Sequence, residues 1–287
     1  MDNEQCVETA SVRLQMLRQK FPVVRQRTLQ LCDPLHVEDY GVQPMADASP
    51  PKWHLAHTSW FFDTFFLAPW QPSYAAFHPA YSELFNSYYN GVGNPFPRAR
   101  RGSLSRPTLE EVLAYRRYVD AATLELVDAT MCSGSPADLV KMTEVLELGI
   151  EHEQQHQELL VTDLKYNFGH NPLYPVYTSQ SCASDGCPGA IRFDEAKPGL
   201  VQIGTDMEGF AFDNERPRHE VFLQPFQVAN RLVTNAEFLE FVEDKGYQRP
   251  ELWLAEAWQQ LQAGTLTPQP LYWRRIQGGG TAPQTSP

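Results

Sequence analysis

Two histidines four residues apart, His152 and His156, lie inside a long helical pattern and constrain the fold of this chain more than any other feature. On an α-helix this spacing separates two side chains by about 40° around the axis and about 6 Å along it, so they share one face. The residues that recur on that face at steps of three and four are Met142, Val145, Gly149, His152, His156, Leu159 and Asp163. This period predicts that both imidazoles point into a core.

Two buried imidazoles need polar partners, because a polar group removed from water without a partner costs free energy. One metal ion shared by His152 and His156 would satisfy both rings, and hydrogen bonds to neighbouring core residues are the alternative. Residues 152–156 also spell HExxH, the zinc-protease motif in which the glutamate is the general base. Only three positions of that motif are fixed, so chance matches are common, and a third ligand is needed to decide between these interpretations.

A third candidate ligand lies upstream, in the apolar and aromatic segment 49–67, which we expect to form a central helix. This segment contains His54 and His57, and the helical period places His54 about 60° away from the face that carries His57. We therefore expect His57 to point inward. The downstream candidates are weaker, because His170 follows the predicted helix end and His219 lies in β-like sequence. Three imidazoles on two helices suit a ferrous or zinc ion with open positions for substrate and oxygen.

Several stretches with a helical pattern predict a four-helix bundle for residues 1–170. They cover about residues 4–20, 22–34, 49–67, 108–131 and 137–168. Thr108 and Glu111 form a capping box at the start of one helix, and Gly169 stops the last one. Long helices joined by one long crossover are typical of such bundles, which build metal sites from residues on facing helices.

The crossover, residues 68–107, is long for a connection within a compact domain and is rich in aromatic residues. It also carries a basic cluster in an otherwise acidic protein: Arg98, Arg100, Arg101 and Arg106. A solvated loop is one interpretation of this segment. The other is a lid over a site, with arginines that bind a substrate carboxylate.

The composition changes after the bundle, and we expect residues 171–198, which are rich in Ser, Pro and Cys, to form a linker. Residues 200–203 and 220–228 then read as strands, and a capping box at Thr234 begins another helix. The sequence thus predicts an α+β protein, with a helical bundle at 1–170 and a second domain at 199–287.

Charge and cysteine usage exclude several classes of partner and compartment. The net charge of −12 argues against a nucleic-acid surface, which needs a basic face. No apolar run approaches the roughly 20 residues of a membrane span, and the acidic N-terminus does not resemble a signal peptide. The five cysteines are scattered, although Cys182 and Cys187 are close enough to pair or bind metal. We expect reduced thiols and a cytoplasmic protein.

The combination of motifs resembles the ergothioneine-biosynthesis sulfoxide synthases (EgtB-type). The matching stretches in the first domain are PKWHLAHTSWFF at 51–62, LFNSYY at 84–89, RGSLSRP at 101–107 and EHEQQHQELL at 151–160. Those in the second domain are FDNERP at 212–217, VTNAEFLEF at 233–241 and PELW at 250–253. The family pairs a DinB-like four-helix bundle with a domain like that of formylglycine-generating enzymes, so the resemblance implies this domain order here.

The resemblance also implies a mononuclear non-haem iron, Fe(2+), held by His57, His152 and His156. His54 falls on a position that is not a ligand in the family, and Glu153 would not be a proteolytic base. The implied reaction uses O2 to join a thiol, from cysteine or γ-glutamylcysteine, to the imidazole of hercynine (Nα-trimethylhistidine), and its product is a sulfoxide.

Four further residues are candidates for substrate contacts or chemistry. Tyr88 and Tyr89 match family positions at the active site, where a phenol could donate a proton or an electron, and aromatic packing is the alternative interpretation. Arg101 and Arg106 are candidates for binding substrate carboxylates.

The family's second domain is longer than residues 199–287, and we expect the similarity to end near Arg275. The chain would then carry only the N-terminal part of that domain and an incomplete substrate cavity. The alternative functions are a truncated metal-binding paralogue without turnover, a DinB-like metal-dependent thiol transferase, and a selenoneine synthase that joins a selenosugar to the same histidine betaine.

Overall fold

The computed structural model describes residues 3–87, 91, 93–179, 188–207 and 209–273. The chain divides into two compact units, Met1–Tyr177 and Thr178–Pro287. The first unit is helical and the second contains the strands, which confirms the predicted α+β class with a helical bundle followed by a smaller sheet-containing part. Among the described residues, no helix is both long enough and apolar enough to cross a membrane.

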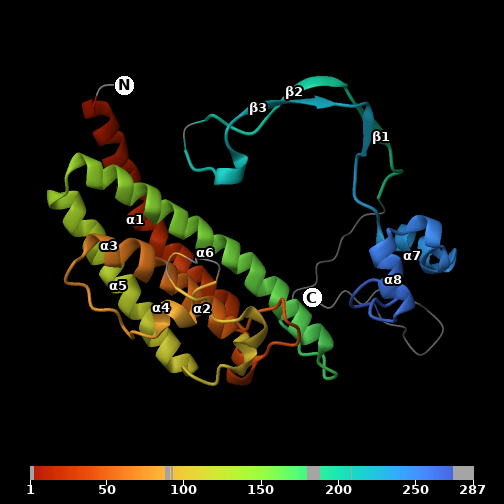
Figure 1. Ribbon diagram of the computed structural model, residues 1–287, viewed down its shortest axis with the longest axis horizontal. Coiled ribbons are helices and arrows are strands. Elements are labelled where there is room, and N and C mark those ends of the chain that lie inside the picture. Colours follow the sequence, from red (N-terminus) through yellow and green to blue (C-terminus); the bar gives the residue numbers. More distant parts are fainter. Residues whose placement is uncertain (1–2, 88–90, 92, 180–187, 208, 274–287) are drawn as a thin grey trace. The chain divides into compact units, whose positions relative to one another are not determined.

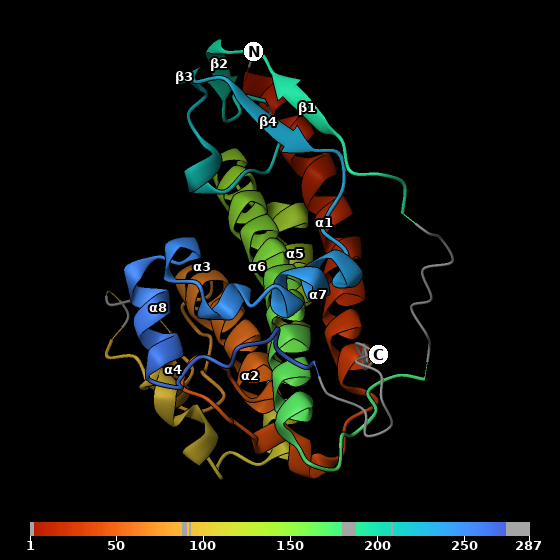
Figure 2. The ribbon, with the colours of Figure 1, turned by 90° about the vertical axis from the view of Figure 1, so that its right-hand side faces the viewer.

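Four long helices form the first unit: α1 (Asn3–Cys32), α2 (Pro51–Phe61), α5 (Leu109–Ser133) and α6 (Pro136–His170). Helix α6 packs along α1 and also against α2, while α5 packs against α1 and α2 (Figures 1 and 2). A π-helical turn, Phe62–Leu67, and the short α3 (Ala68–Trp70) continue α2. The crossover contains α4 (Tyr81–Leu84) and a 3-10 helix at Arg98–Ser103, and a further 3-10 helix lies at Val37–Gly41.

Helix α1 is continuous, whereas the sequence predicted two helices separated near Pro22. Its buried stripe continues through the proline at steps of three and four residues: Leu14, Leu17, Phe21, Val24 and Thr28. Pro22 itself lies on the exposed side of the helix, where the carbonyl group that loses its hydrogen bond can be solvated. Burial of the stripe therefore outweighs the local cost of the proline.

The helix starts follow the predicted capping signals. The backbone N–H of Thr108 donates to Glu111 at 2.6 Å, and the N–H of Glu111 donates to the Thr108 hydroxyl at 3.2 Å. This confirms the capping box of α5. At the start of α6, the Ser135 hydroxyl accepts the N–H of Asp138 at 3.2 Å. Both helices that frame the bundle are thus fixed at their N-terminal ends by local side chains.

The helices that carry the candidate ligands approach each other closely at Gly149. A Cβ atom at this position would lie 2.4 Å from Cε1 of Phe62 and 3.0 Å from Cε1 of Phe61. Phe62 in turn packs edge-on against Phe21 of α1, with 5.0 Å between the ring centres. Only a glycine allows α6 to pack this closely against the end of α2.

The described residues of the second unit form two separate two-stranded antiparallel sheets. Strand β1 (Phe193–Ala196) pairs with β4 (Phe226–Ala229), and β2 (Gly199–Ile203) pairs with β3 (His219–Leu223). The sequence predicted one strand across 220–228, but two form because Pro225 cannot donate to a strand ladder.

Within the described residues, the strands are followed by the α-helices α7 (Asn235–Glu243) and α8 (Ala255–Gln262), with 3-10 helices at Gly246–Gln248 and Pro250–Leu252 between them. Thr234 and Glu237 form the predicted capping box at the start of α7. Strand β1 lies within the segment that we expected to be a linker, residues 171–198. The domain boundaries themselves stay a prediction.

Candidate metal centre

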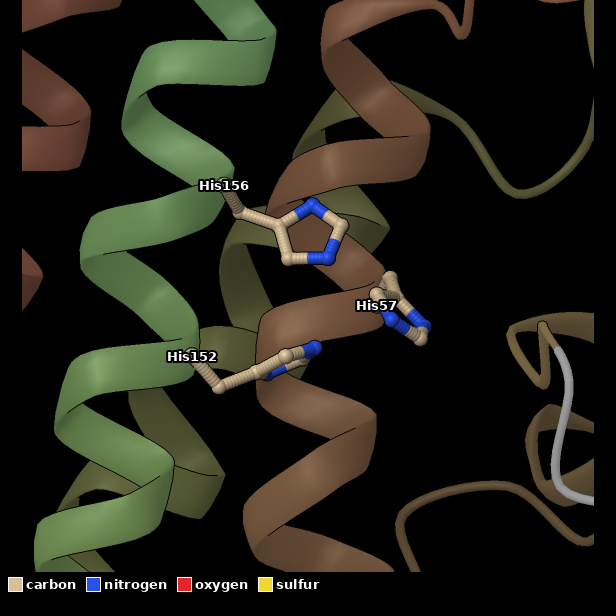
Figure 3. A group of neighbouring side chains, drawn as sticks. All are labelled: His57, His152 and His156. Atoms are coloured by element: carbon tan, nitrogen blue, oxygen red, sulfur yellow. The ribbon is translucent and has the colours of Figure 1, made fainter. Parts of the chain in front are cut away.

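Three histidines from two helices converge in the bundle. His57 comes from α2, and His152 and His156 come from successive turns of α6, so that their rings face one another (Figure 3). One ring nitrogen from each residue lies within 4.8 Å of the others. His57 and His156 are buried and His152 is half-buried. Small side-chain rotations would bring all three nitrogens onto one ion.

The ring of His57 is held on both faces and at one edge. It stacks between Trp53, at 4.4 Å between ring centres, and Trp60, at 5.2 Å, with both pairs of planes within 14° of parallel. Its Nδ1 lies 2.6 Å from the backbone carbonyl of Phe85. Because a carbonyl only accepts, this contact places the ring proton on Nδ1 and leaves the Nε2 lone pair available as a ligand.

His152 has a buried nitrogen that no neighbour satisfies. Its ring lies against Phe61, with 4.8 Å between ring centres. Within the described part of the chain, Nδ1 has no hydrogen-bond partner although it is buried. Buried polar atoms in folded proteins nearly always have a partner. A metal ion among the three imidazoles fits this site, because it would engage the ring that hydrogen bonds leave unsatisfied.

His54, the histidine predicted to point elsewhere, is also buried, and it lies beside the cluster. Its Nδ1 is 3.0 Å from Nδ1 of His156, and its Nε2 is 3.0 Å from Oδ2 of Asp163. Sequence reasoning missed this contact. The sequence did contain one indication of it: Asp163 lies seven residues after His156 on the same helical stripe and could have been recognised as a carboxylate partner for a buried histidine.

Burial keeps the three imidazoles uncharged. It is the largest cause that lowers the pKa of His57 and His156 well below the ordinary value, and neighbouring histidines lower both further. Burial also lowers the pKa of His152 to about 4. Neutral rings offer the lone pairs that a metal ion needs.

Metal binding at this cluster is therefore expected to persist in mildly acidic solution. Protons compete with the metal for the same nitrogens, and a lowered pKa means that fewer protons are bound at a given pH. An exposed histidine cluster would lose its metal as the pH falls through about 6.5. Co2+ occupancy, followed by visible absorption from pH 7 to pH 4, should remain high to about pH 5. Loss of the ion between pH 7 and pH 6 would contradict this prediction.

The glutamate of the HExxH motif is engaged elsewhere. Glu153 is fully buried (0% exposed), and it accepts hydrogen bonds from Arg25 at 2.7 Å and from Thr28 at 2.6 Å. It also forms an ion pair with Arg116. Burial raises the pKa of Glu153, but Arg116 and Arg25 outweigh it and lower the pKa to about 2. This carboxylate is thus fixed between two guanidinium groups, which does not suit a general base.

Known families match both units of the chain. Residues 21–160 match the DinB superfamily, and residues 192–287 match the sulfatase-modifying factor enzyme 1-like domain. Similar proteins include the hercynine oxygenases of Mycolicibacterium thermoresistibile, 30% identical over 90% of this chain, Mycolicibacterium smegmatis, 28% over 88%, and Mycobacterium tuberculosis, 27% over 90%. The two matched domains, in this order, and these relatives support the resemblance of the chain to the EgtB-type proteins.

The chain spans about half the length of these relatives, namely 54% of the first and 56% of the other two. The match to the sulfatase-modifying factor enzyme 1-like domain continues to residue 287. Our expectation that the similarity ends near Arg275 is therefore wrong.

The two arginines proposed for substrate binding by an EgtB-type protein have different surroundings. Arg101 is buried, donates to the hydroxyl groups of Ser49 at 2.9 Å and Ser87 at 3.1 Å, and its guanidinium lies 3.3 Å from the ring centre of Trp53. Since Trp53 stacks on His57, Arg101 belongs to the surroundings of the cluster. Arg106 is exposed and donates to the carbonyl of Ser105 at 3.0 Å. The structure brings Arg101, but not Arg106, to this stack.

Tyr88 and Tyr89, the candidates for proton or electron donation in the EgtB-type reaction, lie outside the described residues. The same holds for Cys182 and Cys187. Their roles stay predictions from the sequence.

Proposed function

We propose that this chain binds one iron ion through His57, His152 and His156 and acts in O2-dependent sulfoxide synthesis. A thiol, from cysteine or γ-glutamylcysteine, would be joined to the imidazole of hercynine. The observation that carries the proposal is the convergence of three neutral, largely buried imidazoles in an EgtB-type chain. The names of the three hercynine oxygenases support the substrate assignment.

The proposed reaction balances with O2 as the only oxidant. The thiol loses its S–H hydrogen and the imidazole loses a C–H hydrogen as the carbon–sulfur bond forms. One oxygen atom enters the sulfoxide and the other leaves as water, which consumes all four oxidising equivalents of O2. Fe(2+), held by His57, His152 and His156, would supply the activation of oxygen.

The residues of the chain would position the reactants and exclude water. Trp53 and Trp60 fix the plane of His57 and form an apolar wall beside it. We propose that Arg101 and Arg106 contact substrate carboxylates, in line with the interpretation of their segment as a lid over the site. We propose further that Tyr88 or Tyr89 donates a proton or an electron during the oxygen chemistry. A cytoplasmic location, and partners limited to small molecules without nucleic acid or membrane, complete the proposal.

Sulfoxide formation is expected when the chain is loaded anaerobically with Fe(2+) and mixed with hercynine, a thiol and O2. Parallel reactions with cysteine and γ-glutamylcysteine, followed by mass spectrometry, would identify the thiol. His57→Ala serves as the inactive control. Tyr88→Phe or Tyr89→Phe should leave iron binding unchanged and lower product formation by about 100-fold, because a proton donor is lost.

Two outcomes would contradict parts of this proposal. A chain that holds iron and gives no sulfoxide with either thiol would be a metal-binding paralogue without turnover. Unchanged rates and products in both tyrosine variants would show that these rings only pack.

A further inference from the structure

A chain of hydrogen bonds leads away from the cluster on the side of His156. It runs from His156 Nδ1 to His54 Nδ1 at 3.0 Å, and from His54 Nε2 to Asp163 Oδ2 at 3.0 Å. The same oxygen of Asp163 accepts the backbone N–H of Ser49 at 2.8 Å. His54 is 2% exposed and Asp163 is 9% exposed, so the chain is shielded from water.

The chemistry of these groups fixes the direction of each hydrogen bond. An ionised carboxylate only accepts, so His54 must carry its proton on Nε2 to donate to Asp163. The Nδ1 of neutral His54 is then an acceptor. His156 must therefore donate from its own Nδ1, which leaves its Nε2 with the lone pair. In this arrangement His156 can bind a metal only through Nε2.

His54 does not fit the role of a fourth ligand. Both of its ring nitrogens are engaged, one with His156 and one with Asp163. It also lies outside the group of His57, His152 and His156, whose ligand atoms are close enough for one ion. His57 has a comparable support, because the Phe85 carbonyl holds its Nδ1. Two of the three candidate ligands thus have an oriented outer nitrogen.

We propose that His54 and Asp163 are positioning residues that set the tautomer and ring orientation of His156 for metal binding. This inference rests on the metal site of the proposed function, and it is independent of the reaction catalysed there. Partners of this kind raise metal affinity because the ring is already held in its binding tautomer, and their loss typically costs about 10–100-fold in affinity. The Asp163–Ser49 contact extends the support to a residue two positions before the start of α2.

The test combines a tautomer measurement with metal titrations. In the metal-free wild-type chain with 15N-labelled histidine, long-range 1H–15N correlation spectra should show His156 protonated on Nδ1 and His54 protonated on Nε2. In His54→Phe, which keeps an aromatic ring but no hydrogen bond, His156 should lose this single tautomer. Co2+ affinity should then fall by about 10–100-fold. The matched control is His170→Phe, which replaces an exposed histidine on α6, the helix of His156.

Two conservative variants separate positioning from mere packing. His54→Gln offers both an acceptor and a donor and should recover most of the Co2+ affinity. Asp163→Asn should also stay close to the wild type, because one amide oxygen can accept both N–H groups that Oδ2 accepts. Asp163→Leu, which removes that oxygen, should resemble His54→Phe.

The inference is overturned if His156 is protonated on Nε2 in the metal-free wild type, a measurement that needs no variant to fold. It is also overturned if His54→Phe binds Co2+ as tightly as His54→Gln. A wild-type chain that binds no Co2+ but has the expected tautomers would refute the proposed metal function, while the hydrogen-bond chain would stand.

Discussion

Replacement of His57, His152 or His156 by alanine, one at a time, is expected to reduce iron binding from about one ion per chain to almost none. Each variant removes one of three protein ligands and leaves a cavity where a donor was. The loss of affinity should exceed the roughly 100-fold that is typical for loss of a supporting residue. Anaerobic loading with Fe(2+), desalting and metal analysis measure the occupancy directly.

A control on the same helix separates this effect from a general loss of structure. His170 is exposed, and its Nδ1 lies 2.8 Å from the carbonyl of Tyr166. His170→Ala should therefore bind iron as the wild type does. Full occupancy in any one of the three ligand variants would show that the ion, if bound, does not use that histidine.

Glu153→Ala is expected to lower the free energy of unfolding by about 3–5 kcal/mol, as is typical when one partner of a buried ion pair is removed. The variant would leave Arg116 and Arg25 buried without the carboxylate that pairs with both. Arg25 keeps a second partner in Asp120, at 2.6 Å. Urea denaturation measures the change, with Glu158→Ala on the exposed side of α6 as a control expected within about 0.5 kcal/mol of wild type.

The ion pairs of Glu153 with Arg25 and Arg116 also predict that the free energy of unfolding depends on pH. The pKa of Glu153 is lowered from 4.5 to about 2 in the folded protein, so the unfolded chain binds this proton more tightly. Its contribution to stability is present above the unfolded pKa and is lost as the pH falls through the folded pKa. The stability difference between wild type and Glu153→Gln should thus shrink between about pH 5 and pH 2. A difference that stays constant over this range would contradict the ion-pair assignment.

Local periodicity was sufficient to predict which faces of the helices carry the candidate ligands. His152 and His156 lie on a stripe in which Met142 and Gly149 are buried and Val145 is half-buried, although Leu159 at its edge is exposed. A helix turns the apolar side of such a pattern toward the core. The same period selected His57 over His54 as the inward residue. His57 does join the cluster, yet His54 is equally buried, because α2 is surrounded by other elements on nearly all sides.

The partners of these residues could not be predicted, because they depend on tertiary contacts between distant segments. Asp163 lies more than a hundred residues from His54, and no spacing rule connects them. Arg101 was a candidate for binding a substrate carboxylate, and the contact of its guanidinium with the ring of Trp53 could not be foreseen. The proline in α1 misled the prediction for a related reason: the packing of Phe21 and Val24 outweighs a local helix-breaking signal.

The close contact at Gly149 has a consequence for the size of ion that the bundle accepts. The ring of Phe62 occupies the space where any side chain at residue 149 would lie, one helical turn before His152. A methyl group there would wedge α6 away from the end of α2 and spread the histidines that the two helices present. Gly149 has no donor atom, yet it helps to set the spacing between the histidine nitrogens of the two helices. This spacing in turn limits the radius of the ion that would fit between them.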